Sequence, residues 1–190
     1  MFELKVFADP VELRWSGATV SLRPKERVLL CQLVFAPGMS MPGRGLASDM
    51  RYRGSPDGAG TALRKQMSNL RGAVRAAAGE RVAGVLLATE PGNRGAIYRL
   101  NLDPASVDAL RFSELVAAGQ RRAAAGRWEE AVADFGVALA LWQGGPLREA
   151  ARWPFAQAVV ARLREQRRVA QLGLAELRQA AGLHRELVND

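Results

Sequence analysis

The chain has 190 residues, enough for one or two small domains, and its formal net charge at pH 7 is +8. Hydrophobic residues make up 48% of the chain, which excludes a disordered protein. The single cysteine, Cys31, excludes an intramolecular disulfide. Because no basic-then-apolar N-terminus and no long uncharged apolar segment occurs, we expect a cytoplasmic protein without a signal peptide or a membrane span.

The positive charge is concentrated in the first half of the chain. Residues 1–104 hold 15 Lys or Arg against 9 Asp or Glu, a net of +6. Residues 105–190 hold 12 against 10, a net of +2. A local excess of cations is what a phosphate-binding surface needs, so the first half is where we look for one.

Short strands open the chain. Residues 2–7 read FELKVF and alternate apolar with charged side chains, and residues 11–15 alternate again. Gly17 marks a tight turn before a third strand at 19–22. Three strands this close together predict a small antiparallel sheet.

A strongly predicted helix and a weakly predicted one follow. Pro24 opens a helix over 25–35 that is apolar around most of its circumference, so we expect it to be buried, with Cys31 as a core residue. The next 22 residues, 39–60, contain five glycines and two prolines. They predict one short, poorly stabilised helix, capped by Ser40, with Leu46 and Met50 on its inner face.

The most informative stretch is 60–78, which reads GTALRKQMSNLRGAVRAAA. Its apolar residues recur at helical spacing and predict one buried face: Leu63, Met67, Leu70 and Val74. The other faces carry four cations and several amide or hydroxyl groups, with no carboxylate. Such a helix suits DNA, whose phosphates bind Arg and Lys and whose base edges accept and donate hydrogen bonds. A solvated basic face of a structural helix remains the alternative.

A hairpin is expected next, with strands at 85–89 and 96–102 around the turn sequence EPGNRG. Arg94 lies at the tip of this turn. It is either one more solvated arginine or a wing-tip residue that contacts phosphate or enters a minor groove.

This order of elements indicates a winged helix-turn-helix with extra strands in front. The stretches KERVLLCQLVFAPG, ALRKQMSNLRGAV and IYRLNLDP resemble the OmpR-type DNA-binding domain of the Streptomyces antibiotic regulatory protein (SARP) family. One departure is the second helix, PGRGLASDMRY, which places Arg51 where the family usually has a large aromatic residue. The segment that aims the recognition helix is therefore expected to be loosely held.

The second half is expected to be wholly helical. Asp103 and Pro104 mark the predicted boundary, and a tetratricopeptide-type pattern of small and aromatic residues follows at Gly119, Ala131, Phe135 and Ala138. A long helix is predicted from Pro154 to Ala181, ended by Gly182. This half resembles the bacterial transcriptional activation domain that follows the winged helix in SARP proteins. Family members continue through further helices. We therefore expect this domain to be incomplete, to be naturally short, or to cover its last apolar face by dimerising.

The predicted fold is therefore mainly α with a small β component. Residues 1–104 form an OmpR-type winged helix-turn-helix, with an N-terminal antiparallel sheet, three helices and a C-terminal hairpin wing. Residues 105–190 form an all-α, tetratricopeptide-like domain.

The resemblance implies a sequence-specific transcriptional activator that binds direct repeats near promoters and recruits RNA polymerase. The expected partners are double-stranded DNA, RNA polymerase holoenzyme and a second copy of the chain on DNA, and no membrane. We expect Arg64, Ser68 and Asn69 to read bases and Lys65, Arg71 and Arg75 to hold phosphates. With Gln66 and the wing residue Arg94 added, the candidate DNA-binding set is Arg64, Lys65, Gln66, Ser68, Asn69, Arg71, Arg75 and Arg94.

No catalytic constellation, cofactor motif or metal-ligand set is present, and the only histidine, His184, is in the last segment. We therefore expect no enzyme, no cofactor and no metal. The alternative function is a degenerate paralogue that acts as a protein-interaction module through its helical domain, with weak or no DNA binding.

Overall fold

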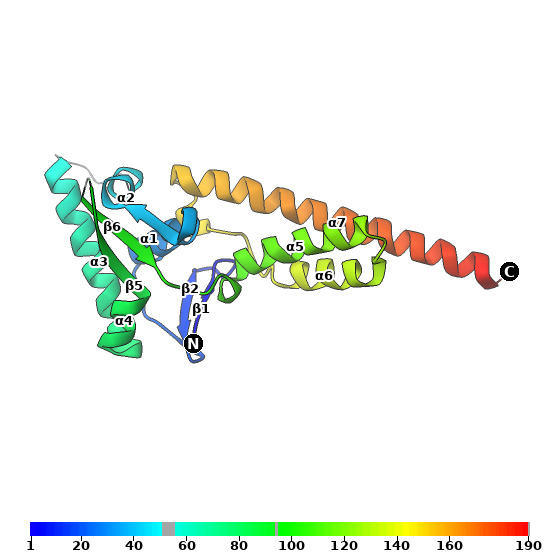
Figure 1. Ribbon diagram of the computed structural model, residues 1–190, viewed down its shortest axis with the longest axis horizontal. Helices are drawn as coiled ribbons and strands as arrows, with labels where there is room; N and C mark the ends of the chain where they lie inside the picture. The colour runs from blue at the N-terminus through cyan, green and yellow to red at the C-terminus, as the bar shows by residue number, and fades with distance from the viewer. Residues whose placement is uncertain (51–55, 94, 190) are drawn as a thin grey trace.

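The computed structural model describes the backbone of residues 1–50, 56–93 and 95–189 and the side chains of 1–50, 58–93 and 95–180. The molecule is elongated, with the winged-helix half at one end and a set of long helices toward the other (Figure 1). The predicted fold class is confirmed in both halves. No helix in the described part of the chain is long and apolar enough to cross a membrane.

The N-terminal sheet is antiparallel, in the order β1-β2-β3. Its strands are β1 (Phe2–Lys5), β2 (Glu12–Trp15) and β3 (Ala18–Thr19). Ser16 and Gly17 both have positive φ, 49° and 86°, and make the tight turn between β2 and β3. The sheet lies between the winged-helix core and the helical half (Figure 1).

The first helix, α1 (Pro24–Val34), begins with proline at its first position, as expected. Next come the 3-10 turn η1 (Pro37–Met39), β4 (Ser40–Pro42) and α2 (Gly43–Asp49). The expectation that Ser40 caps a helix is wrong, because Ser40 pairs with Arg99 in β6. Backbone hydrogen bonds with a strand about 60 positions away (99 − 40 = 59) outweigh the local capping preference.

The third helix, α3 (Pro56–Ala78), contains the predicted basic stretch. It is followed by α4 (Glu80–Leu86), β5 (Leu87–Gly92) and β6 (Gly95–Leu100), and the second sheet has the order β4-β6-β5. The predicted strand at 85–89 is displaced, because Val85 and Leu86 belong to α4. Ala83 and Leu86 are both buried and lie three positions apart, so one face of this short helix packs on the core.

The helical half contains η2 (Pro104–Ser106), α5 (Asp108–Ala124), α6 (Trp128–Ala140), η3 (Arg148–Ala150) and α7 (Pro154–Asn189). A Cβ built on Gly119 would lie 2.6 Å from Phe135, so the predicted small-against-aromatic packing between α5 and α6 is confirmed. Gly182 does not end the last helix, which continues to Asn189. One glycine costs a helix about 1 kcal/mol, which the surrounding turns can offset.

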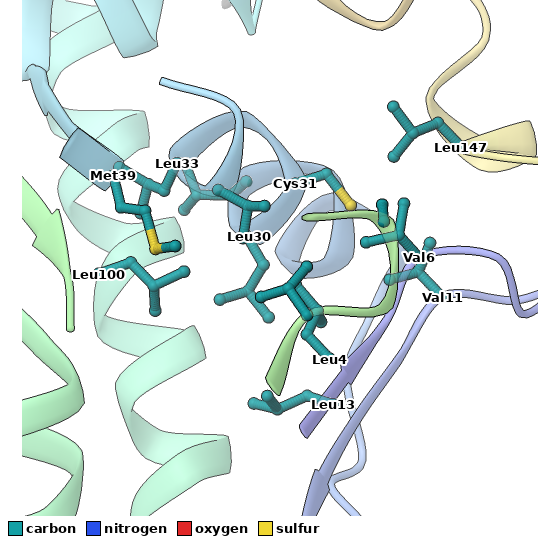
Figure 2. Packing of buried hydrophobic residues seen from close by; sticks show 14 of the residues in the cluster. Leu4, Val6, Val11, Leu13, Leu30, Cys31, Leu33, Met39, Leu100 and Leu147 are labelled. Carbon is teal, nitrogen blue, oxygen red and sulfur yellow. The ribbon is translucent and has the colours of Figure 1, made fainter. Parts of the chain in front are cut away.

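The two halves share one hydrophobic core. Leu147, from the helical half, lies beside Cys31 of α1 and Val6 of the N-terminal sheet (Figure 2). The Phe7 ring lies 5.5 Å from that of Phe112 and 4.6 Å from that of Trp142, measured between ring centroids. The division of the chain at residue 104 stays a prediction, since apolar packing continues across it.

Polar contacts also join the two halves, at the junction where they share the hydrophobic core. Asp108, at the start of α5, accepts hydrogen bonds from the backbone N–H groups of Val6 (2.7 Å) and Phe7 (3.1 Å). Arg27 of α1 makes a bidentate pair with Glu149, at 2.6 and 2.7 Å. Burial raises the pKa of the Asp108 carboxyl, and these backbone donors oppose that shift by stabilising its charged form.

Candidate nucleic-acid interface

The inner face of α3 is fully buried. The exposed fraction of its four apolar side chains is at most 2%, and they join the same core as the leucines of α1: Leu63, Met67, Leu70 and Val74 with Leu29, Leu30 and Leu33. Because side chains at a helical spacing of three and four share one face, this packing fixes how α3 is rotated about its own axis. The remaining faces of α3 are thereby turned away from the core.

The outer face of α3 carries exposed cations. Arg64, Lys65 and Ser68 are all exposed. The guanidinium of Arg64 donates to the hydroxyl of Thr61 at 2.9 Å, and neither Arg64 nor Lys65 has a carboxylate partner among the described residues. Between residues 60 and 78 the sequence contains no Asp or Glu. Over residues 60–78 this face therefore presents positive charge with no carboxylate on the same stretch of helix.

The amide side chains lie on the opposite flank from the arginines. Gln66 and Asn69 are half-buried. Their positions, at 100° per residue, lie on one side of the exposed ridge, and Arg64, Arg71 and Arg75 lie on the other. The α3 candidates thus differ in burial: Gln66, Asn69 and Arg71 are half-buried, and Arg64, Lys65, Ser68 and Arg75 are exposed.

Arg71 binds the wing. Its guanidinium donates to the backbone carbonyl of Leu87 from Nε (3.0 Å) and Nη2 (2.7 Å), and Nη2 also donates to the Thr89 hydroxyl. Leu87 and Thr89 belong to β5, so this side chain joins α3 to the wing strand that follows it. The phosphate-binding role expected for Arg71 stays a prediction, but most of its donors already face protein.

The last candidate that the structure describes is Arg75, near the C-terminal end of α3. Arg75 forms an ion pair with Glu80 at the start of α4, and its side chain is exposed. An exposed pair of this kind is weak, about 0–1 kcal/mol, and a phosphate can replace the carboxylate. Arg94 lies outside the described residues.

Close packing explains one of the glycines in the second helix, α2. A Cβ on Gly43 would lie 3.1 Å from the Tyr98 ring, 3.3 Å from the Ala96 carbonyl oxygen and 3.6 Å from Leu63. Gly43 therefore lets α2 approach the wing strand β6 closely, while its contact with Leu63 of α3 is at ordinary van der Waals distance. The expected looseness of this region is not what the packing around Gly43 indicates, and Arg51 lies outside the described residues.

Sequence reasoning missed the contacts that hold the surface in place. The pairing of β4 with β6 and the bonds from Arg71 to β5 both join residues far apart in the chain. A serine at a helix start and an arginine on a basic helix give no local signal of such partners. The glycines of α2 are the one local signal of close packing in this region, because they permit close approach, although from the sequence alone they predict a poorly stabilised helix.

Neither a reactive thiol nor a metal-ligand cluster is found among the described residues. Burial raises the pKa of the Cys31 thiol well above its usual range, so it stays protonated and unreactive. No group of three or more His, Cys, Asp or Glu side chains that could hold a metal ion occurs in the described part of the chain. The side chain of His184 lies outside it.

Comparison with known proteins gives consistent matches. Residues 107–190 match the family described as bacterial transcriptional activator domain. The transcriptional regulatory proteins EmbR of Mycobacterium tuberculosis and Mycobacterium bovis are each 30% identical to this chain over 174 residues, which cover 91% of this chain and 43% of the relative. A solved structure of Mycobacterium tuberculosis EmbR in complex with a low affinity phosphopeptide superposes with a TM-score of 0.81 at 28% identity, covering 95% of this chain and 46% of that one. The chain spans less than half the length of these relatives.

Proposed function

Since residues 107–190 belong to the bacterial transcriptional activator domain family, and the chain as a whole is of the SARP type, we propose that this protein is a sequence-specific DNA-binding transcriptional regulator. It acts as an activator that binds direct repeats near promoters, with α3 in the major groove. Its helical half then recruits RNA polymerase holoenzyme.

One observation carries the DNA-binding part of the proposal: the exposed face of α3 is cationic and free of carboxylates over residues 60–78. Its apolar face is held by the core, so the cations are presented in a fixed orientation. DNA supplies the phosphates that such cations bind, and an α-helix fits the width of the major groove.

The individual roles follow from position. Arg64, Ser68 and Asn69 contact base edges, since arginine pairs with guanine and asparagine with adenine. Lys65 and Arg75 bind phosphates on either side of the groove. Gln66 lies with Asn69 on the side of α3 that carries the amide groups. Arg94, on the wing, contacts phosphate or the minor groove.

Arg71 takes a different role from the one its sequence position suggests. Its three hydrogen bonds to Leu87 and Thr89 make it the residue that sets the angle between recognition helix and wing. We place it as a positioning residue, which acts on DNA through the wing.

The helical half acts by protein contact. Helices α5, α6 and α7 pack as a tetratricopeptide-like unit, and architectures of this kind offer extended surfaces to other proteins. Two copies bind head to tail on adjacent repeats, so that association occurs on DNA.

The salt dependence of duplex affinity tests this proposal. Fluorescence anisotropy of a labelled duplex with the full chain should give a steep fall of affinity with salt, about 0.9 in log–log slope for each phosphate neutralised. Changing Arg64, Lys65 and Arg75 together to Ala should lower that slope by about 1.8, for the two phosphate contacts of Lys65 and Arg75, and should also remove the base preference that Arg64 contributes.

A matched triple variant distinguishes a specific DNA-binding surface on α3 from a general effect of the protein's net charge. Arg162, Arg164 and Arg178 are exposed on α7, so changing all three to Ala removes the same charge from the other half. This variant should bind DNA like the parent. Equal losses in both triples would contradict the assignment of α3, and no binding by the folded parent would favour the protein-interaction module.

A further inference from the structure

The outer face of α6 is apolar and exposed. In Figure 1 this helix lies along one edge of the helical half, and its inner side packs against α5 and α7. Trp128 and Val137 have exposed fractions of 56% and 45%. From residue 131 to residue 147 the sequence has one charged residue, Asp134, which is buried and paired with Arg122 of α5. A helix face in contact with water normally carries charges, so this face is suited to contact with protein.

The sizes of the side chains on this face follow the same order in both directions along the helix. Small residues lie at the middle, a valine follows on each side, and a large residue lies at each end. At 100° per residue, the side chains that form this series are all exposed or half-buried: Trp128, Val132, Ala133, Gly136, Val137 and Leu141. An antiparallel second copy, related by a two-fold axis between residues 134 and 135, therefore meets each of them with a side chain of similar size.

The middle of the face is open enough for a second helix. A Cβ built on Gly136 has no neighbouring group within 4 Å. With Ala133 opposite Gly136 of the other copy, two helices can approach to the short end of the usual range of about 8–10 Å between axes. At each end Trp128 then packs on Leu141, and tryptophan is among the residues that most often anchor interfaces. The exposed Glu129 lies opposite Ala140 at the rim, where its carboxylate stays hydrated.

We propose that the outer face of α6 binds the same face of a second copy of this chain, in antiparallel orientation. The order of sizes favours a second copy over an unrelated helix, because a two-fold interface requires one patch to be complementary to itself. The middle of the face is also uncharged, so two chains that each carry a net charge of +8 can meet there without placing like charges in contact.

This contact differs from the head-to-tail association proposed on DNA. Head-to-tail binding keeps both copies in the same orientation, whereas the α6 contact reverses one of them. It forms in the absence of DNA and does not depend on the proposed DNA-binding function, so each of the two proposals can fail without the other.

Sedimentation velocity of the full chain without DNA tests the association, at about 0.3 M salt to screen the net charge. The sedimentation coefficient should rise with protein concentration from that of a monomer to that of a dimer, because a contact between two single helices is small and weak. A chain that stays monomeric up to about 1 mM would overturn the proposal and leave this face to a helix of another protein. Assemblies that grow beyond a dimer would also overturn it, since a two-fold contact closes on itself.

A matched pair of glycine variants locates the surface. Gly136→Gln places a side chain at the helix crossing but improves helix propensity, so it should weaken dimerisation at least tenfold without lowering the melting temperature. Gly84→Gln makes the same change in α4, where a built Cβ also has no neighbour within 4 Å, and should dimerise like the parent. Val137→Glu should weaken dimerisation as well. Parent-like dimerisation of both Gly136→Gln and Val137→Glu would overturn the assignment of this face.

Disulfide trapping tests the orientation, and the parent thiol Cys31 is buried. A mixture of Glu129→Cys and Ala140→Cys should form a mixed disulfide under mild oxidation, because the two-fold axis places these positions opposite each other. Neither variant alone should crosslink, since the two copies of one position lie about 17 Å apart along the helix axis, too far for a disulfide. Crosslinking of Glu129→Cys with itself would indicate parallel helices and overturn the two-fold arrangement.

Discussion

The outer face of α3 and the junction between the two halves both contain arginines, but their carboxylate partners differ. The junction arginines pair with carboxylates of the other half, whereas on α3 only Arg75 has a carboxylate partner among the described residues, Glu80 of α4. At the junction, Arg27 pairs with Glu149 and Arg148 pairs with Asp9 at 2.7 Å. On α3, neither Arg64 nor Lys65 has a carboxylate partner in the described residues. We therefore base the proposed nucleic-acid surface on the cations of α3 that have no carboxylate partner among the described residues, and not on the number of cations.

The difference has a physical reason. The Arg27 and Glu149 side chains have exposed fractions of only 16% and 21%, so each charge needs the other to offset lost hydration. The hydrogen bonds to Glu149 hold the pKa of Arg27 above its usual range. Arg64 and Lys65 on α3 are exposed and have no carboxylate partner among the described residues. In the proposed complex, their binding to phosphates releases counterions from DNA.

The largest expected effect comes from breaking the junction at Asp108. Asp108→Ala leaves the buried backbone N–H groups of Val6 and Phe7 without acceptors, and each such loss costs about 1–3 kcal/mol. We expect the free energy of unfolding in urea to fall by about 3 kcal/mol. Asp103→Ala, which removes an acceptor from an exposed turn, should cost less than about 1 kcal/mol. A loss at Asp108 no larger than that at Asp103 would show that the junction does not depend on this carboxylate.

The Arg27–Glu149 pair should give the next largest effect. Glu149→Ala leaves a half-buried guanidinium without its partner, and we expect a loss of about 2 kcal/mol in the free energy of unfolding. The double variant Arg27→Met, Glu149→Leu should recover most of that loss, because it removes both charges. Arg148→Ala breaks an exposed pair and should cost less than about 1 kcal/mol. Failure of the double variant to recover stability would contradict the pairing.

Arg71 should behave as part of the scaffold, unlike its neighbours on α3. Arg71→Ala removes the bonds to Leu87 and Thr89, and we expect a loss of about 1 kcal/mol in the free energy of unfolding together with weaker binding of all duplexes. Arg64→Ala should leave stability within about 0.5 kcal/mol and reduce only sequence-specific affinity. If both variants kept full stability, Arg71 would belong with the phosphate contacts instead.

The smallest expected effect is at Lys65. In the proposed complex Lys65 binds one phosphate, so Lys65→Ala should reduce the log–log salt slope of DNA binding by about 0.9 and weaken all sequences equally. Anisotropy titrations at several salt concentrations measure this slope. An unchanged slope would place Lys65 outside the interface.

The parts of the fold that rest on local periodicity could be predicted from the sequence. The buried face of α3 and the Gly119–Phe135 packing follow from spacing along single helices, and both are found in the structure. The three N-terminal strands follow from alternation and from the turn at Gly17.

The rest depends on contacts between distant residues. Ser40 gives a capping signal but pairs with β6, and Val85 gives a strand signal but completes α4. From the sequence, Asp108 is only an acidic residue at the start of a helix. Its hydrogen bonds from Val6 and Phe7, 102 and 101 positions earlier, leave no signal in the local sequence. The candidate DNA surface was predictable because charge and burial alternate along one helix. The hydrogen bonds from Arg71 to β5 could not be predicted, because the acceptors are backbone and hydroxyl oxygens of another element.

Selection of bound sequences from a random duplex pool, with the full chain at moderate salt, tests the central claim most directly. The account predicts enrichment of a short direct repeat with units spaced by whole helical turns, and loss of base preference within each unit for Asn69→Ala. No enrichment by protein that circular dichroism shows to be folded would contradict the claim that the exposed face of α3 reads DNA.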